Sequence, residues 1–247
     1  MGKVSSCKKA RGKTKRIMLD SVTFNRGIVD SELQVAIIAA LKDEIRAFGS
    51  ASLLVSGGST PKRLFDLLSN EKLEWDKVTL SLVDERFLPN GHTDQNGELI
   101  KEHLLKNEAI KANFIPLVFD PADAENNLNM AVKAFENVSR PFTVVVLGMG
   151  TDGHTASLFP DSPMLDRAMD KNSSEILLNV TTPSSPYSRI TFSRKVLLDA
   201  KNLFLHYYGA EKKEILASVL DCTNQNKYPI SGFVNQKENV LKVYWAM

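Results

Sequence analysis

Three short apolar segments of this chain each end abruptly in a loop rich in glycine or charge. The segments and their loops are Ala51–Ser56 before Gly57-Gly58, Val78–Val83 before Asp84-Glu85-Arg86, and Phe142–Leu147 before Gly148-Met149-Gly150. Continuous apolar runs of this length are typical of buried strands in a parallel sheet. In open sheets of this kind, ligands bind at the carboxyl ends of the strands. We therefore expect the three loops to share one rim of a sheet and to carry the functional site.

Segments with helical spacing of apolar residues alternate with the predicted strands. The first covers 31–48, with Asp30 or Ser31 as its N-cap. The other predicted elements are helices over 61–70, 97–106, 122–138 and 210–220, strands over 175–180, Arg189–Phe192, Asn202–Tyr208 and Val240–Tyr244, and irregular chain over 87–97 and most of 160–188. This alternation predicts an α/β fold, an open, mostly parallel sheet with helices on both faces. For 247 residues we expect a single domain.

Charge is distributed unevenly between the amino-terminal end and the rest of the chain. The formal net charge is +2, but residues 1–16 hold seven lysines and arginines and no acidic residue, which leaves −5 on the remainder. An acidic body argues against a large nucleic-acid surface, so we expect no nucleic-acid partner. We expect residues 1–17 to be a disordered basic extension and 18–247 to be the domain. The alternatives are an arm for nucleic acid or membrane surfaces, or a true start at Met18.

The cysteines and the hydropathy pattern indicate a cytoplasmic protein. Cys7 and Cys222 are too few for a disulfide framework, and neither belongs to a CxxC pair, which fits a reducing compartment. No apolar run reaches the length of about 18 residues that a membrane-spanning helix needs. The basic amino-terminal end also lacks the apolar stretch of a secretory signal. We therefore expect a cytoplasmic location and no membrane partner.

The loop Gly57-Gly58-Ser59-Thr60 stands between a predicted strand and a predicted helix. Its two glycines allow a ligand to approach the backbone closely, and the following helix N-terminus supplies free N–H groups. The hydroxyls of Ser59 and Thr60 add further donors. The pattern predicts a phosphate site, with a plain tight turn as the alternative.

The loop after Leu147 combines a glycine-rich turn with an acid and a histidine. Residues 148–153 formally match GxGxxG, but His154 follows at once and Pro160 comes soon after, so we expect no dinucleotide. A histidine at the carboxyl end of a strand can act as a general base, and Asp152 can orient it. A structural histidine bonded to the loop backbone is the alternative.

The remaining polar residues are weaker candidates. Asp84-Glu85-Arg86 places three charges at a strand end, where one can bind substrate while another pairs internally; an ordinary solvated strand end is the alternative. Lys212 lies near a helix start, which is unfavourable for a cation unless it faces an anion; a solvated lysine is the alternative. We expect His92, His103 and His206 to be surface or core residues. No pair of His, Cys or Asp has metal-ligand spacing, so we expect no catalytic metal.

Three motifs give the chain a resemblance to a known family. They are SGGSTP at Ser56–Pro61, DERFLP at Asp84–Pro89 with Asn96 downstream, and LGMGTDGHTASLFP at Leu147–Pro160. Over about residues 30–220 the chain resembles the family of glucosamine-6-phosphate isomerases (deaminases) and 6-phosphogluconolactonases. The resemblance implies a Rossmann-like fold. On the lactonase branch it implies hydrolysis of 6-phospho-D-glucono-1,5-lactone to 6-phospho-D-gluconate, in the oxidative pentose phosphate pathway.

The resemblance also implies roles for individual residues. His154 is the base that activates water, with Asp152 as its partner, and backbone N–H groups of the 148–154 turn are expected to stabilise the oxyanion. The residues implied in substrate and phosphate binding are Gly57, Gly58, Ser59, Thr60, Asp84, Arg86, Arg189 and Lys212. No cofactor is implied. The partner is a small sugar-phosphate lactone, and we expect a monomer or a weak homo-oligomer.

Two alternatives from other functional classes stay open. The deaminase branch carries an aromatic residue at the position of Arg86 and a glutamate at the position of Phe159, and both differences favour the lactonase. The second alternative is a non-catalytic sugar-phosphate-sensing domain of a transcription regulator. The roughly 30 residues before the fold are too short and irregular for a helix-turn-helix, which argues against it.

Overall fold

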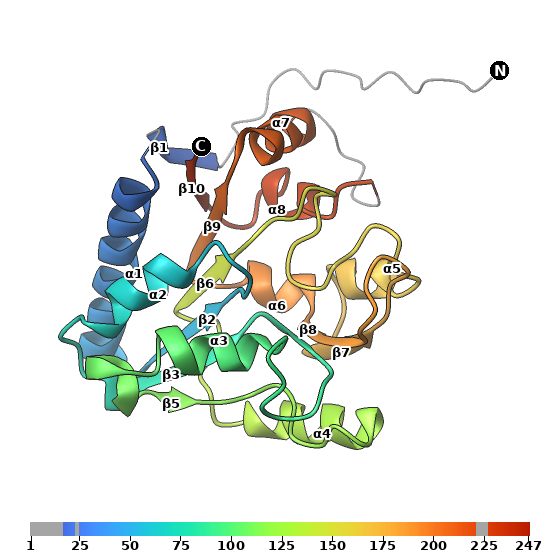
Figure 1. Cartoon of the computed structure of the whole chain (residues 1–247), viewed down its shortest axis with the longest axis horizontal. Coiled ribbons are helices and arrows are strands. Elements are labelled where there is room, and N and C mark those ends of the chain that lie inside the picture. Colours follow the sequence, from blue (N-terminus) through green and yellow to red (C-terminus); the bar gives the residue numbers. More distant parts are fainter. Residues whose placement is uncertain (1–16, 23–24, 221–226) are drawn as a thin grey trace.

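A seven-stranded sheet runs through the computed structural model, which describes residues 17–22, 25–220 and 227–247 (Figure 1). In spatial order its strands are β1 (Ile17–Val22), β10 (Leu241–Ala246), β9 (Asn202–Tyr208), β6 (Val144–Leu147), β2 (Ala51–Val55), β3 (Val78–Leu82) and β5 (Asn113–Phe114). Every neighbouring pair is parallel. The α/β fold and the mostly parallel sheet predicted from the sequence are confirmed.

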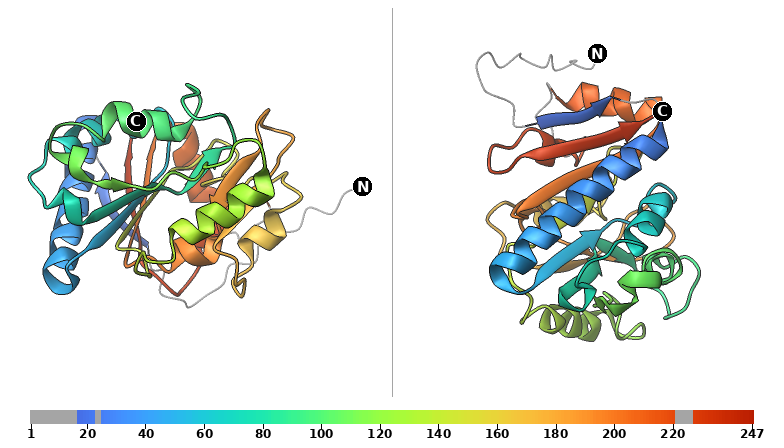
Figure 2. Two further views of the ribbon diagram at one scale, coloured as in Figure 1. Left: turned by 90° about the horizontal axis from the view of Figure 1, so that it is seen from below. Right: turned by 90° about the vertical axis from the view of Figure 1, so that its left-hand side faces the viewer.

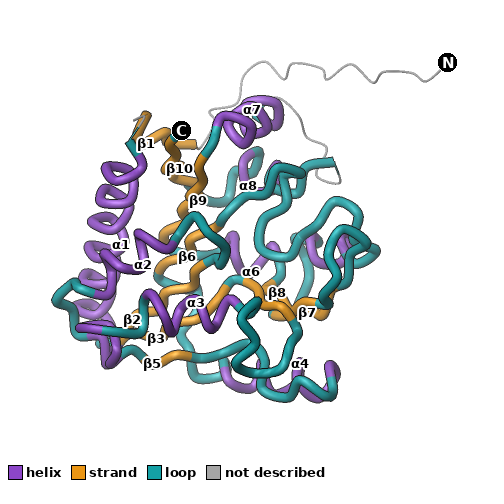
Figure 3. The backbone as a smooth tube through the Cα atoms, in the orientation of Figure 1, coloured by secondary structure: helices purple, strands orange, loops and turns teal. Residues whose placement is uncertain are grey.

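Helices cover the sheet, and the longest of them lies across one of its faces. In the right-hand view of Figure 2, α1 (Arg26–Phe48) lies in front of the strands. The others are α2 (Lys62–Ser69), α3 (Asn96–His103), α4 (Ala124–Ala134), α5 (Leu165–Met169), α6 (Arg194–Leu198), α7 (Ala210–Val219) and α8 (Ser231–Val234), with 3-10 turns at Trp75–Lys77 and Asn107–Lys111. The chain between β6 and the next strand is mainly loop (Figure 3).

The helix α1 begins more than one turn earlier than the apolar pattern predicts. Its N-cap is Asn25, whose side chain accepts a hydrogen bond from Gly27 N–H at 2.9 Å. The prediction of Asp30 or Ser31 as the N-cap is therefore wrong. Val29 extends the buried face one turn before Leu33, and Asp30 is fully buried inside the helix.

A second, three-stranded antiparallel sheet lies on the side of the main sheet away from α1 (Figure 1). Its order is β4 (Asp84–Arg86), β8 (Arg189–Phe192) and β7 (Leu177–Val180). We expected Asp84-Glu85-Arg86 to follow a strand directly, whereas these residues form a strand of their own. Pairing with β8 gives them a hydrogen-bonding ladder and sets Arg86 opposite Arg189.

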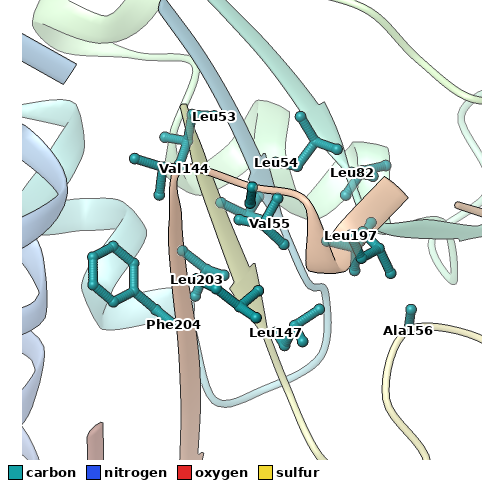
Figure 4. Close-up of a cluster of buried hydrophobic side chains, with 14 of the residues drawn as sticks. Leu53, Leu54, Val55, Leu82, Val144, Leu147, Ala156, Leu197, Leu203 and Phe204 are labelled. Atoms are coloured by element: carbon teal, nitrogen blue, oxygen red, sulfur yellow. The ribbon is translucent and has the colours of Figure 1, made fainter. Parts of the chain in front are cut away.

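The apolar core lies where the strand interiors of the main sheet meet the covering layers. Leu53, Val55, Val144 and Leu203 are buried in the cluster shown in Figure 4. Ala156, from the loop after β6, packs into the same cluster, so this loop is anchored to the core. Within the described ranges no helix has the length and apolarity needed to span a bilayer. The basic segment 1–16 and both cysteines lie outside those ranges.

Candidate active site

A cavity of about 260 Å³ opens at the carboxyl ends of β2 and β6. Its walls are residues 55–61, Phe65, Asp84, Arg86, Asn96, residues 146–150 and 154–156, Arg189, His206 and Lys212. All three predicted loops therefore meet at one rim, as expected. His154 and every predicted substrate-binding residue line the cavity, and Asp152 contacts His154 directly.

Asp152 and His154 form a hydrogen-bonded pair at the cavity wall. Nδ1 of His154 lies 2.6 Å from Oδ1 of Asp152, which also accepts the backbone N–H of His154 at 3.1 Å. Burial acts to raise the pKa of Asp152, but the hydrogen bond and charge of His154 outweigh it, and this pKa lies below its ordinary value. A carboxylate at Nδ1 keeps a proton there and leaves Nε2 as an acceptor. Among the described residues none is hydrogen-bonded to Nε2, so this nitrogen is available to a ligand.

Gly150 makes the room that this pair occupies. A Cβ at Gly150 would lie 2.3 Å from Nδ1 and Cε1 of His154 and 2.6 Å from Oδ1 of Asp152. The N–H of Gly150 donates to the carbonyl of His154 at 2.9 Å and closes the turn. In this GxGxxG match, the second glycine therefore serves close packing against the histidine.

The turn over residues 148–154 is supported by two further contacts. The carboxyl-terminal segment reaches it through Ile230, whose N–H donates to the carbonyl of Gly153 at 3.0 Å. The ring of Phe159 lies beside the ring of His154, with centroids 4.3 Å apart and planes tilted by 32°. The backbone contact therefore anchors the turn, and the neighbouring aromatic ring restricts the position of the imidazole.

The glycine loop leaves its backbone donors free at the cavity. None of the hydrogen bonds among the described residues uses the N–H groups of residues 57–60. Gly57 is required by close packing, because a Cβ there would lie 1.9 Å from Oδ1 of Asn96. Ser56 fixes the start of the loop, since its Oγ donates to the carbonyl of Val146 at 3.1 Å and accepts the N–H of Gly148 at 2.8 Å. Free N–H groups before a helix are suited to an anion.

Two arginines face each other across β4 and β8 at the cavity. Nη1 of Arg86 donates to Oδ1 of Asn96 at 2.8 Å, and Nη1 of Arg189 lies 3.6 Å from Oδ2 of Asp84. Burial, together with the like charge of Arg86, lowers the pKa of Arg189 against the pull of Asp84 and Glu85. Asp84 is itself held by the hydroxyl of Ser157 at 2.5 Å. The side chains at this wall favour a negatively charged or hydroxyl-bearing ligand.

Glu85 is absent from the cavity lining, and its carboxylate binds backbone N–H groups. Its carboxylate accepts the N–H groups of Arg86, Asn96 and Gly97 at 2.6, 2.8 and 2.7 Å and thereby caps the start of α3. Burial raises the pKa of Glu85 to about 7, although these hydrogen bonds act to lower it. The expectation that one of the three clustered charges pairs internally is met by Glu85.

Lys212 lies in the first turn of α7, half-buried against the cavity. Burial lowers its pKa, and the charges of Glu211 and Asp152 act in the opposite direction. A desolvated cation at a helix N-terminus needs a compensating anion. In the described part of the chain, no group of three His, Cys, Asp or Glu side chains has the geometry of a metal site.

Hydrogen bonds within the 148–154 turn reduce the number of its backbone N–H groups that could stabilise an oxyanion. Within the 148–154 turn, the N–H groups of Gly148, Gly150, Gly153 and His154 are already donated to protein acceptors. The N–H of Met149 is used by no hydrogen bond among the described residues, and Met149 lines the cavity. Most of the turn is therefore unavailable to a developing oxyanion, which the sequence pattern could not indicate.

Comparison with known proteins identifies the family of this chain. A family model described as glucosamine-6-phosphate isomerases/6-phosphogluconolactonase matches residues 28–245. The chain belongs to this family. A 6-phosphogluconolactonase of Rhizobium meliloti is 41% identical over 208 residues, which are 84% of this chain and 90% of that protein. One from Pseudomonas aeruginosa is 38% identical over 213 residues, 86% of this chain and 88% of that protein.

Solved structures extend the likeness to the fold. A 6-phosphogluconolactonase from Shewanella baltica superposes with a TM-score of 0.88 at 32% identity, covering 97% of this chain and all of that one. The likeness covers nearly the whole chain, so both sheets belong to the fold shared with that lactonase. The resemblance stated from the three sequence motifs is confirmed.

Some residues of this family site escaped the sequence analysis. Ser157 holds Asp84 and Ser56 joins two strand ends, but single serines next to motifs give no signal of their own. His206 was expected in the core or on the surface; it is buried, in line with that expectation, and it also lines the cavity, which was not expected. Its position two residues before the end of a predicted strand, at the same rim as the other loops, was the available signal.

Proposed function

We propose that this protein hydrolyses 6-phospho-D-glucono-1,5-lactone to 6-phospho-D-gluconate in the oxidative pentose phosphate pathway, as a cytoplasmic enzyme. The observation that carries the proposal is the 2.6 Å pair of Asp152 and His154 in a cavity lined by cations and free backbone donors. In this proposal residues 18–247, together with Ile17 at the start of β1, form the lactonase domain, the residues before them are an extension outside the chemistry, and the protein is a monomer or weak homo-oligomer.

His154 supplies the proton transfers of the reaction. Nε2 accepts a proton from water as the water oxygen attacks the lactone carbonyl carbon. The tetrahedral intermediate then collapses, the bond between that carbon and the ring oxygen breaks, and the imidazolium returns the proton to the departing oxygen. Asp152 stabilises the imidazolium between these steps, and the N–H of Met149 is our candidate oxyanion donor.

The anionic end of the substrate is held by groups already arranged for it. The N–H groups and hydroxyls of Ser59 and Thr60 suit phosphate oxygens, and Lys212 supplies a point charge. Arg86, Arg189 and Asp84 bind the remaining phosphate or sugar oxygens. Because this binding energy is available before the reaction, it positions the carbonyl near His154.

An assay with freshly prepared lactone tests the activity directly. We expect proton release above the spontaneous rate, with saturation by the phosphorylated lactone. Incubation with glucosamine-6-phosphate should release no ammonia, because Phe159 occupies the position where the deaminase branch carries a glutamate. Ammonia release, or a lactone rate equal to the spontaneous one, would reject the proposal.

The variant Lys212→Met should raise KM for the phosphorylated lactone by about tenfold or more, with kcat changed little, because it deletes a charge-assisted contact to the phosphate. The comparison substrate is the unphosphorylated glucono-1,5-lactone, whose KM should not change. The matched control is Lys213→Met, which removes the next lysine on α7, whose Nζ lies 4.5 Å from the ring of Trp245. An equal loss with both substrates would argue against a phosphate contact.

Excess chelator should leave kcat and KM unchanged, since the proposed proton transfers use only His154. The measurement is the initial rate before and after dialysis against chelator, with a buffer-dialysed sample as the reference. Restoration of a lost rate by a divalent metal would contradict a metal-free mechanism.

A further inference from the structure

The strand β9 carries a buried histidine that the proposed chemistry does not use. His206 lies between the buried residues Leu205 and Tyr207, in the interior of a parallel sheet where continuous apolar residues are the rule. Its side chain lines the cavity. A buried imidazole is costly unless it is partnered, so its surroundings indicate what it does.

The partner of His206 comes from α1. Nε2 of His206 lies 3.1 Å from Oδ1 of Asp30, with side chains only 2% and 0% exposed. The same carboxylate oxygen accepts the hydroxyl of Tyr208. Its other oxygen lies 3.6 Å from Nε of Arg63, whose side chain is 61% exposed and therefore well screened by water. The buried carboxylate thus needs a positive charge that Arg63 supplies only weakly.

The groups around this pair come from every element that packs against it. They are Asp30 and Arg26 on α1, Arg63 on α2, Tyr208 on β9, Tyr244 on β10 and Lys212 on α7. Among these described groups Asp30 is the negative one. Nε2 of His206 is at ion-pair distance from Asp30 but has no hydrogen-bond partner among the described residues, and no hydrogen bond of the described residues uses Nδ1.

His206 lies close to the proposed phosphate groups. Asp30 joins it to Arg63, the second residue of α2, and α2 begins directly after the loop that holds Ser59 and Thr60. Lys212 follows the end of β9 within the first turn of α7. An anion bound between that loop and Lys212 would therefore lie beside the imidazole.

We propose that His206, held by Asp30, is a further binding residue for the substrate's phosphate and takes up a proton when the phosphate binds. The proposal rests on the proposed lactonase function, which puts a phosphate in this cavity. The doubly protonated ring forms an ion pair with Asp30 through Nε2 and can donate Nδ1–H to the phosphate. The neutral ring has no charge to attract either anion, so phosphate affinity decreases as the pH rises.

Sulfate is the appropriate probe, because its charge does not change over the range in which imidazole titrates. We expect the sulfate Kd of the wild-type protein to rise about tenfold between about pH 5.5 and pH 8.5, the range over which histidine loses its charge. Calorimetry near neutral pH in two buffers of different ionisation enthalpy should show uptake of a fraction of a proton on binding. This measurement needs no substitution and stands even if a variant fails to fold.

The variant His206→Gln should weaken sulfate binding at low pH by about tenfold and remove the steep pH dependence and the proton uptake. Asp30→Asn should weaken the pH dependence and the proton uptake, because the variant removes the negative charge beside His206. The matched control is His103→Gln, because His103 also pairs with an aspartate, Asp66, at 3.2 Å but does not line the cavity. It should behave as the wild type.

Steady-state kinetics distinguish a failure of the proposed role of His206 from a failure of the proposed lactonase function. His206→Gln should raise KM for the phosphorylated lactone without lowering kcat, and should leave the unphosphorylated lactone unaffected. A wild-type pH dependence of sulfate binding in His206→Gln, or wild-type binding without proton uptake, would overturn the role of His206. A wild-type protein that binds sulfate with proton uptake but does not hydrolyse the lactone would instead reject the proposed function alone.

Discussion

Replacing His154 with alanine should lower kcat for the phosphorylated lactone by at least about a hundredfold, the range expected when general acid–base catalysis is lost. KM should change little, because the phosphate contacts remain in place. The stability of the fold should also be nearly unchanged, since the ring is partly exposed at the cavity wall and lies outside the core. Initial rates with fresh lactone, corrected for spontaneous opening, measure the effect.

The matched control for this variant is His92→Ala. His92 is an exposed histidine whose ring lies 6.2 Å from that of Tyr187 and does not line the cavity. Its removal should leave kcat at the wild-type value. If His154→Ala kept the wild-type kcat, the proton would have to be taken by another group, and the proposed mechanism would be wrong.

Replacing Gly150 with alanine should reduce kcat by nearly as much as the loss of His154, roughly a hundredfold. A methyl group here would stand 2.3 Å from two atoms of the imidazole, so the ring or the Asp152 side chain must move. Either movement separates the base from the carboxylate that orients it. The effect acts through geometry alone, because every catalytic side chain is still present.

Thermal unfolding distinguishes this loss from simple misfolding. Gly150→Ala should keep a Tm near that of the wild type, because the clashing atoms belong to the ends of side chains at a partly open cavity. Gly97→Ala is the control, since a Cβ there would meet its nearest atom, Oε2 of Glu85, at 3.4 Å, an ordinary contact. Full activity of Gly150→Ala would show that the imidazole is not held where the structure has it.

The sequence predicted where the candidate site lies in the fold better than it predicted which side chains contact one another there. Three apolar runs that stop at glycine or charge are local patterns, and parallel strands bring their carboxyl ends to one edge whatever the details of packing. Ser59, Arg86 and His154 could therefore be assigned to one rim before any coordinates. The family motifs around them supplied the chemistry.

What escaped prediction depends on contacts between distant segments. Asp84-Glu85-Arg86 has no apolar alternation, and it becomes a strand only because β8, about a hundred residues later, offers a ladder. Asp30 resembled a helix cap because acids favour that position. Its burial follows from His206 and Tyr208, which no local pattern connects with it.

The position of β1 has a consequence for how the molecule is assembled. Among the described strands β1 is hydrogen-bonded to β10 alone, with Ile17 opposite Leu241. The first strand in the sequence can therefore join the sheet only after the last strand has formed. Closing so long a loop is entropically expensive until the intervening strands have already brought its ends together. Docking of β1 is therefore a late event in folding. Amide hydrogen exchange along this edge would report whether β1 has paired with the carboxyl-terminal strand.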